Sequence, residues 1–378
     1  MSKSIYHTEK SEGTVFKILL VVVLICMVSW LTSCHKEPDP PSPQPQDTTL
    51  ITHGIYIMNE GLFNQNNATL TRFDFKDSTS VTDYFFNKNG RGLGDTGSDM
   101  GLYGTKLYIV VNVSSQVEVA DAKTGVSLAR IPLFDNQKAR QPRKIAFYGR
   151  HAYVCNFDNT VAVIDTASLQ VIKYIETGRN PDGILAAYGK IWVSNSGGLA
   201  FPDYDNTISV IDPENQTEER RINVGINPYT LRSDNRGNIF LISRGNYSNV
   251  KSRLQVIEAE SGNLIKTFEE FEALGMAISG DSAWVYNYDW QSGKSSVKII
   301  NTTNLEIVSD SFLGDDNKVN SIYGIAVDEQ AKLVYITDAG NFTGNGRVYA
   351  FDFSGKHIFD FPAGINPSAM VFLTKRDY

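Results

Sequence analysis

One strand-like segment recurs along this chain and constrains the fold more than any other feature. Residues 160–169 read Thr-Val-Ala-Val-Ile-Asp-Thr-Ala-Ser-Leu, and altered copies of this segment occur six more times. Each copy places β-branched or aromatic residues at alternating positions and then enters a turn, which is typical of a strand. Seven copies indicate a repeat architecture. The other copies span residues 68–75, 116–125, 207–216, 253–262, 296–305 and 347–356.

Two further recurring segments indicate how many strands each repeat holds. An aromatic residue marks a second strand, and its copies follow one another at intervals of 39 to 52 residues. This is close to the length of a four-stranded propeller blade. A third strand begins at an Asn-Pro pair, as at Asn180-Pro181 and Asn227-Pro228. The aromatic positions are Tyr56, Tyr108, Tyr153, Trp192, Phe240, Trp284 and Tyr335.

The two ends of the repeat region complement each other. The first repeat lacks the Asn-Pro strand, whereas residues 364–373 are an Asn-Pro strand with no repeat after it. Pairing these two ends would complete one blade and remove the open sheet edge. The sequence therefore predicts an all-β fold, a seven-bladed β-propeller of four-stranded blades closed by pairing the C-terminal strand with the N-terminal blade.

Residues 1–33 have the organisation of a lipoprotein signal peptide. Lysines precede an apolar run at residues 18–30, which has the length of a signal-peptide core and is short for a bilayer span. The run leads into Leu-Thr-Ser-Cys34, which resembles a bacterial lipobox, so Cys34 is the predicted lipidation site. Residues 34–50 then form a proline-rich, extended tether before the propeller of residues 51–378. An anchor that is never cleaved is the alternative.

Composition excludes several classes of function. A hydrophobic content of 42% and a charged content of 20% describe an ordinary globular protein, and a net charge of −7 argues against nucleic acid as a partner. Only Cys155 among the cysteines lies within the repeats, as an inert thiol in an apolar strand. His53, His151 and His357 fall in different blades. We therefore expect no enzyme activity, metal site or cofactor, although a triad assembled in space stays open.

The loops indicate which face of the propeller carries a site. Because strands alternate in direction, the loops after the aromatic strands share one face with the loops that enter the Asn-Pro strands. Aromatic residues gather in these loops, and together they suit a flat, extended ligand. The alternative is that the rings fold back over the blade edges. These residues are Phe63, Phe201, Tyr204, Tyr247, Tyr288, Trp290 and Phe342.

Asn or Asp ends the aromatic strand in most repeats, as Asn59, Asn112, Asn156 and Asn195 do. Such side chains cap turns by bonding to nearby backbone groups, and this structural role comes first. The same ring of amides could also bond a polar ligand at the mouth of the channel.

Residues 160–169 and the segment Asn-Pro-Asp-Gly-Ile at 180–184 resemble the YncE-like family of seven-bladed propellers. More narrowly, Gly-Ile-Tyr-Ile-Met-Asn-Glu-Gly-Leu-Phe at 54–63 resembles the opening blade of surface lipoprotein propellers from gut anaerobes, the BtuG type. Members of that group with a known role capture cobalamin at the cell surface and pass it to a TonB-dependent outer-membrane transporter. The resemblance implies a binding protein whose corrin ligand lies on the loop-bearing face.

The leading hypothesis is therefore a lipid-anchored protein of the outer membrane, facing the cell exterior, that binds cobalamin or a related corrinoid for a TonB-dependent transporter. A glycan or a surface protein is the alternative ligand. An enzyme on this scaffold, such as a lactonase or lyase, would need a polar cluster near the central channel. The predicted ligand-binding residues are Asn59, Glu60, Phe63, Tyr204, Asn227, Tyr247, Tyr288, Trp290 and Phe342.

Overall fold

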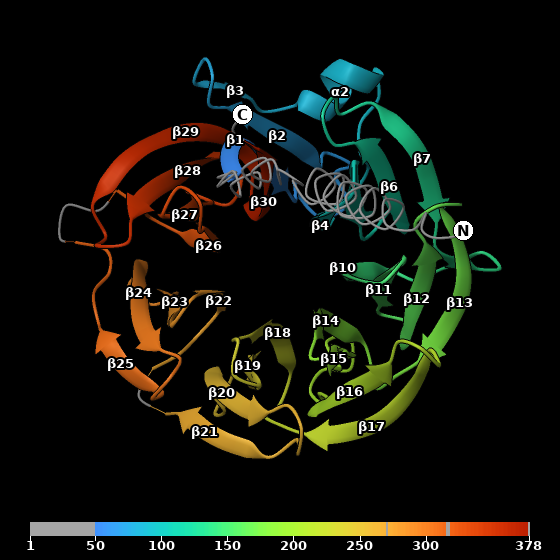
Figure 1. Cartoon of the computed structure of the whole chain (residues 1–378), viewed down its shortest axis with the longest axis vertical. Helices are drawn as coiled ribbons and strands as arrows, with labels where there is room; N and C mark the ends of the chain where they lie inside the picture. The colour runs from blue at the N-terminus through green and yellow to red at the C-terminus, as the bar shows by residue number, and fades with distance from the viewer. Residues whose placement is uncertain (1–49, 270, 315–317, 377–378) are drawn as a thin grey trace, which may run out of the picture. The chain divides into compact units, whose positions relative to one another are not determined.

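A computed structural model describes residues 50–269, 271–314 and 318–376. Seven four-stranded antiparallel sheets lie around a central opening, and the innermost strand of each sheet faces that opening (Figure 1). The predicted seven-bladed β-propeller is confirmed. The predicted signal peptide, the lipidation site Cys34 and the tether up to residue 49 lie outside the described residues.

Each blade is a sheet of four strands that follow one another from the axis to the rim. The first blade consists of β30 (Pro367–Arg376), β1 (Leu50–Asn59), β2 (Thr69–Asp74) and β3 (Thr79–Val81). The next three consist of β4 (Gly97–Tyr103), β5 (Lys106–Val111), β6 (Gln116–Asp121) and β7 (Ser127–Pro132); β10 (Pro142–Tyr148), β11 (His151–Asn156), β12 (Thr160–Asp165) and β13 (Gln170–Glu176); and β14 (Pro181–Ala187), β15 (Lys190–Asn195), β16 (Thr207–Asp212) and β17 (Thr217–Asn223). The last three consist of β18 (Pro228–Ser233), β19 (Asn238–Ser243), β20 (Arg253–Glu258) and β21 (Leu264–Phe268); β22 (Gly275–Ser279), β23 (Ser282–Asp289), β24 (Lys294–Asn301) and β25 (Glu306–Ser309); and β26 (Ile322–Asp328), β27 (Leu333–Asp338), β28 (Asn345–Asp352) and β29 (His357–Ile365).

The chain ends close the ring as the sequence predicts. Strand β30 pairs with β1 in antiparallel register from Leu50 opposite Arg376 to Asn59 opposite Pro367. Two backbone bonds continue this closure beyond the strands, from Glu60 N to the Asn366 carbonyl at 3.0 Å and from Gly61 N to the Ile365 carbonyl at 3.1 Å. No edge is therefore left open between the first and last blades.

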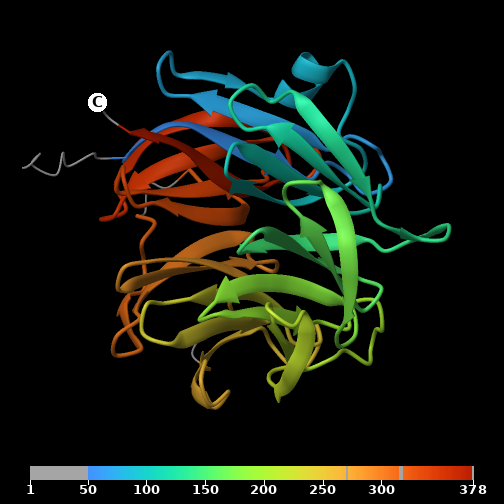
Figure 2. The same ribbon diagram turned by 45° about the vertical axis from the view of Figure 1, so that its right-hand side comes forward.

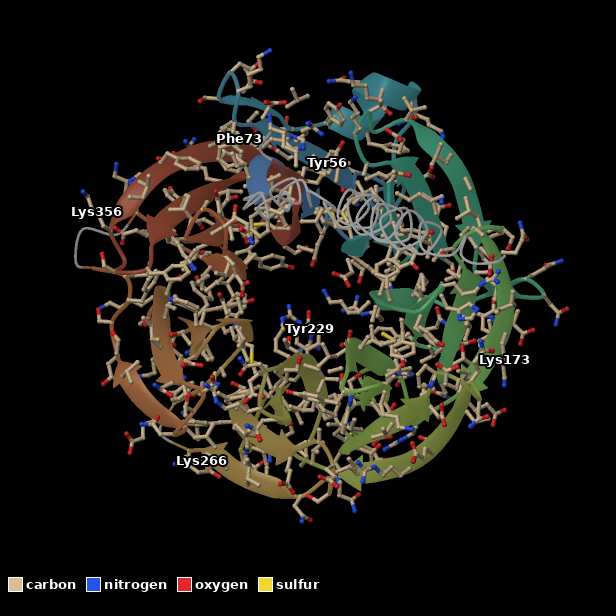
Figure 3. All side chains as sticks on the ribbon, viewed as in Figure 1. Tyr56, Phe73, Lys173, Tyr229, Lys266 and Lys356 are labelled. Carbon is tan, nitrogen blue, oxygen red and sulfur yellow. The ribbon has the colours of Figure 1, made fainter. Side chains whose placement is uncertain are left out.

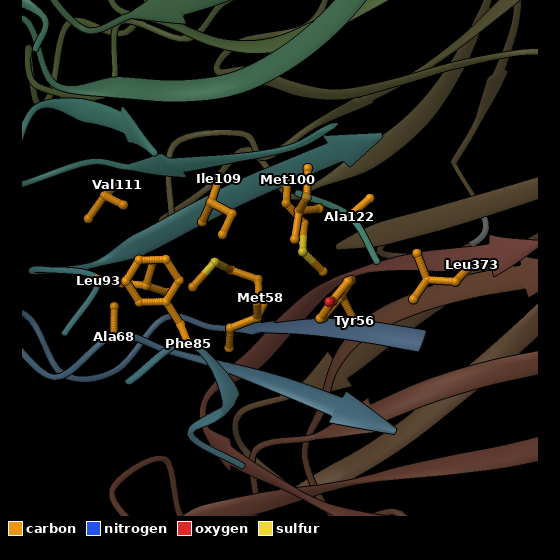
Figure 4. Close-up of a cluster of buried hydrophobic side chains, with 12 residues drawn as sticks. Tyr56, Met58, Ala68, Phe85, Leu93, Met100, Ile109, Val111, Ala122 and Leu373 are labelled. Carbon is orange, nitrogen blue, oxygen red and sulfur yellow. The ribbon is translucent and has the colours of Figure 1, made fainter. Parts of the chain in front are cut away.

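The hydrophobic core lies between neighbouring blades, not along the axis. Figure 4 shows the cluster between the first two blades, where Met58 and Phe85 face Met100 and Ile109. The recurring aromatic residues all lie in such layers and are at most 2% exposed. Because apolar side chains fill the spaces between sheets, the axis itself stays open for polar groups.

Two additions interrupt the regular pattern. The short helix α2 (Tyr84–Asn89) begins at Asp83, whose carboxylate accepts from Phe86 N, and it buries Phe85 against the first blade. Strands β8 (Phe134–Asp135) and β9 (Lys138–Ala139) form a hairpin that projects from the ring between the second and third blades (Figure 2). Among the described residues, no helix has the length and apolar character needed to cross a membrane.

Removing β30 tests how far stability depends on closure. A chain that ends at Ile365 would expose the edge of β1, and we expect most of its stability, on the order of 5–15 kcal/mol for a domain, to be lost. Circular dichroism during heating should then show no cooperative transition.

The matched control replaces residues 134–139 by Asn-Gly. This change keeps the bond between Arg140 N and the Leu133 carbonyl (3.1 Å) within a two-residue turn, so the transition should persist. A cooperative transition near the wild-type temperature in the chain without β30 would contradict the closure argument.

Candidate functional site

A cavity of about 970 Å³ runs along the axis of the propeller. Residues from the innermost strands of all seven blades line it, together with residues from the loops of one face. Figure 3 shows Tyr229 at the edge of the central opening, whereas Lys173, Lys266 and Lys356 lie on the outer rim. The face predicted from the loops therefore opens into a channel that reaches the axis.

A β-bulge lies near the start of most innermost strands, and several of the residues at these bulges line the channel. The strand register skips one or two residues at this point in six of the seven blades. A bulge turns a side chain out of the regular alternation of a strand. The residues that the register skips are Ser98, Arg143, Lys144, Asp182, Tyr229, Thr230, Tyr323, Ser368 and Ala369.

Neighbouring innermost strands approach very closely at the bulges. A Cβ atom on Gly183 would lie 1.8 Å from the Tyr229 carbonyl oxygen, and one on Gly324 would lie 2.1 Å from the Ser368 carbonyl oxygen. Both contacts are to backbone, which cannot move aside as a flexible side chain can. Glycine is therefore required at these two positions, and the close approach brings the bulged side chains of adjacent blades together.

Asp182 is the centre of an ionic network in the channel wall. Its side chain is 1% exposed and accepts from Arg143 Nε at 2.6 Å and from Arg244 Nη1 at 3.0 Å. Burial alone would raise the pKa of this carboxyl, but Arg143 and Arg244 outweigh that effect and the pKa lies below its usual value. Arg244 also lies over the Tyr229 ring, 3.4 Å from its centroid.

Glu60 directly follows β1 in the first blade and also lines the channel. Its Oε2 accepts from the Tyr323 hydroxyl at 2.8 Å. Burial raises the pKa of Glu60, and Lys144 and the Tyr323 hydroxyl reduce that rise. Lys144 donates to the Ser98 carbonyl at 2.9 Å and lies 3.8 Å from Asp99 Oδ1. Both carboxylates and cations therefore line the channel.

Aromatic side chains form the rim of the channel mouth. Trp290 and Phe342 stack with ring centroids 5.3 Å apart, and Tyr288 meets both rings edge-on, at 4.7 and 5.8 Å. Trp290 is 70% exposed and Tyr247 is 68% exposed. Tyr204 lies 6.0 Å from Tyr247, also edge-on. Trp290 and Tyr247 therefore present open surface to solvent and do not fold back over the blade edges.

The structure brings most of the predicted ligand-binding residues to this mouth. Glu60, Tyr247, Tyr288, Trp290 and Phe342 line the cavity. Strand β23 continues through Tyr288 to Asp289, so the loop before β24 contains only residues 290–293. Strand pairing therefore fixes Tyr288 more firmly than a loop would.

Two further predicted residues do not line the cavity. Tyr204 borders it through its contact with Tyr247, and Phe63 is 69% exposed in the loop after β1 but does not line the cavity.

The two predicted asparagines do not reach the channel. Asn59 is fully buried, donates to the hydroxyls of Thr69 and Thr71 at 2.9 Å, and accepts from Gly364 N at 3.0 Å. Asn227 is 1% exposed and adopts a left-handed backbone with φ of 59°, just before Pro228. Both have the turn-forming role that Asn supports, and the structure places them outside the site.

Sequence reasoning missed the charged wall of the channel. Arg143, Asp182 and Tyr229 each follow the proline of the recurring strand, and that motif predicted a strand but not a bulge. A charged or aromatic residue directly after this proline in several repeats was the available signal.

Cys155 is fully buried in β11, and burial raises the pKa of its thiol to about 12, as expected of an inert cysteine.

A family model described as a domain of unknown function, DUF5074, matches residues 53–373. The chain belongs to this DUF5074 family. The match covers the propeller from β1 to β30. A search of curated proteins found no significant match.

Three solved structures illustrate the similarity of the fold. A quinonprotein alcohol dehydrogenase-like protein from Bacteroides thetaiotaomicron is 16% identical with a TM-score of 0.63, covering 85% of this chain and 78% of its own. Hydrazine synthase from Kuenenia stuttgartiensis is 19% identical with a TM-score of 0.61, covering 74% and 95%. A 6-phosphogluconolactonase-like protein from Bacteroides uniformis is 16% identical with a TM-score of 0.59, covering 85% and 99%. At such low identity these similarities concern the fold alone.

The ionic network makes a testable contribution to stability. Asp182→Asn removes the charge between two buried guanidinium groups, and we expect the free energy of unfolding at pH 7 to fall by about 3–5 kcal/mol. Because the folded-state pKa of Asp182 is lowered, its contribution is present above about pH 4 and is lost as the pH falls further. The difference between wild type and variant should therefore shrink below pH 4.

Urea unfolding at several pH values measures this difference. Asp203→Asn is the control, because Asp203 pairs with Arg179 at 3.0 Å while its side chain is 85% exposed, and it should change little. Equal effects of the two substitutions would contradict the role of the buried network.

Proposed function

We propose that this protein binds a corrinoid, such as cobalamin, at the aromatic mouth of the channel. The observation that carries the proposal is the combination of exposed rings at the mouth with charged groups deeper in a cavity of about 970 Å³. A concave site with apolar walls and a few converging polar groups is the usual form of a small-molecule site. The BtuG-type resemblance of residues 54–63 supports the same ligand class.

The chemistry of a corrinoid matches the groups present. Its macrocycle is broad and mostly apolar, so it can lie against Trp290 and Phe342, and its edge carries amide groups that both donate and accept hydrogen bonds. Arg244 and Glu60 line the cavity and supply a donor and an acceptor for such amides. Tyr247 offers an exposed ring on the neighbouring blade.

We propose binding without chemistry. The polar cluster that an enzyme would need is present, but its carboxylates are engaged, Asp182 by Arg143 and Arg244, and Glu60 by Tyr323. Within the described part of the chain, no histidine lines the cavity. These contacts favour a rigid wall that recognises a ligand over one that moves protons.

We further propose that the protein is lipid-anchored in the outer membrane, faces the cell exterior and passes its ligand to a TonB-dependent transporter. The lipobox-like sequence ending at Cys34 and the proline-rich segment after it support this placement. The mouth of the channel would then be presented to the medium at the end of an extended tether.

A glycan is the second candidate ligand. Trp290 stacked with Phe342 forms an exposed aromatic surface on which a sugar ring can lie. A glycan array separates this candidate from the corrinoid.

Calorimetry with cyanocobalamin tests the proposed ligand. We expect binding at micromolar ligand, and we expect Trp290→Ala and Phe342→Ala each to raise the dissociation constant at least about tenfold, equivalent to about 1.4 kcal/mol. The control is Ile172→Ala, because Ile172 is 50% exposed on the rim strand β13, away from the mouth. Absence of heat and of any thermal shift in the wild type would remove the corrinoid. Unchanged affinity in both aromatic variants would remove the rim as its site.

The anchor is tested separately with Cys34→Ser. Lipid attachment needs the thiol, so the variant should leave the membrane fraction and fail to incorporate labelled fatty acid in cells. Cys155→Ser is the control, because that thiol is buried in the propeller and membrane association should persist. Equal membrane association of wild type and Cys34→Ser would contradict lipidation at this cysteine.

A further inference from the structure

We propose that the channel contains a subsite for an anionic group, a carboxylate or a phosphate, that Arg232 receives. The inference rests on the proposed function in one respect, since it takes the channel mouth as the entrance for the ligand. It goes further by naming the chemistry of one part of that ligand.

Among the described cations that line the cavity, Arg232 is the one with no ion pair to a carboxylate. It lies on β18, three residues beyond Tyr229, and lines the cavity with its side chain exposed to the channel. Its Nη1 donates to the Leu231 carbonyl at 2.8 Å. Among residues 50–269, 271–314 and 318–376, no carboxylate oxygen lies within 4.0 Å of this guanidinium.

The other cations of the wall are already paired. Arg143 and Arg244 share Asp182, and Lys144 lies 3.8 Å from Asp99. A guanidinium has five N–H donors in a planar fork that matches a carboxylate or a phosphate. Arg232 therefore keeps N–H donors for a ligand, whereas the neighbouring cations already pair with carboxylates.

The balance of charge around the channel also favours an anion. The cavity is lined by three cations, Lys144, Arg232 and Arg244, and by two carboxylates, Glu60 and Asp99, whereas the whole chain carries a net charge of −7. A concave region with an excess of one sign concentrates ions of the other sign. The channel thus attracts anions although the protein as a whole repels them.

The open N–H groups of Arg232 explain why an anion would bind this residue in particular. Desolvation lowers the pKa of this guanidinium, although Asp99, Tyr229 and Tyr286 partly offset the effect, and the group stays protonated. Because the side chain is exposed to the channel, an incoming anion can reach these N–H groups directly. The phosphodiester of a corrinoid nucleotide and a separate small anion both have the required chemistry.

The first experiment uses inorganic phosphate against chloride at equal ionic strength. Phosphate should raise the thermal unfolding temperature of the wild type. The substitution Arg232→Gln should raise the dissociation constant of phosphate at least tenfold. Arg236→Gln is the matched control in the same blade, because Arg236 pairs with Asp281 at 2.5 Å and does not line the channel. Arg232→Lys keeps the charge and should retain part of the effect, which keeps the test informative if the glutamine variant folds poorly.

The second experiment compares cyanocobalamin, which carries a phosphodiester, with cobinamide, which lacks it. If the phosphodiester fills the subsite, Arg232→Gln should weaken cyanocobalamin at least tenfold and cobinamide less than twofold. If both corrinoids bind the variant normally while the phosphate effect is lost, a separate small anion fills it. If the wild type binds neither corrinoid but phosphate still depends on Arg232, the proposed ligand fails and the anion subsite stands. The inference is overturned if Arg232→Gln changes neither phosphate binding nor corrinoid binding. It is also overturned if phosphate has no effect on the wild type and Arg232→Gln leaves corrinoid binding unchanged.

Discussion

The crowding of seven innermost strands around one axis is the constraint on which the rest of this structure depends. Strands that meet there must approach more closely than ordinary side chains allow, and Gly183 and Gly324 permit this by presenting no Cβ to the carbonyls of Tyr229 and Ser368. The same crowding accompanies a bulge in six blades, which aims the next residues at the axis. The composition of the channel wall is therefore a consequence of how closely the innermost strands pack at the centre.

Residues aimed at the axis cannot all be apolar without filling the channel, and polar residues there need partners. The network around Asp182 answers this requirement, because one buried carboxylate neutralises part of the charge of Arg143 and Arg244 and holds both guanidiniums in place. Glu60 and Tyr323 form a second connection between the first and last blades. These bonds cross from blade to blade, so they fix the geometry of the channel and strengthen the ring that the β1–β30 pairing closes.

The sequence specified the fold better than the site, and the reason is physical. Blade number, strand order and closure follow from periodicity, which a repeated segment displays directly, and all three were confirmed. The exposed rings of Trp290 and Tyr247 could also be predicted, because an aromatic residue in a polar loop stands out. Asn59 and Asn227 could not be assigned correctly, since an Asn that caps a turn and one that faces a ligand look alike in sequence. The open guanidinium of Arg232 could not be predicted either, because only the folded structure shows which carboxylates lie near it.

The exposed rings of the rim and the Arg232 side chain both contribute little to folding, and this bears on function. Trp290 and Tyr247 keep about two thirds of their surface in solvent, so they gain little from burial and contribute little to holding the propeller together. Arg232 likewise neutralises no carboxylate of the described structure. Stability alone gives no reason for a large exposed ring or an unpaired cation at these positions. A ligand that covers the rings and brings an anionic group into the channel would give both features a partner at once, with apolar contact made at the mouth and charge compensated deeper inside.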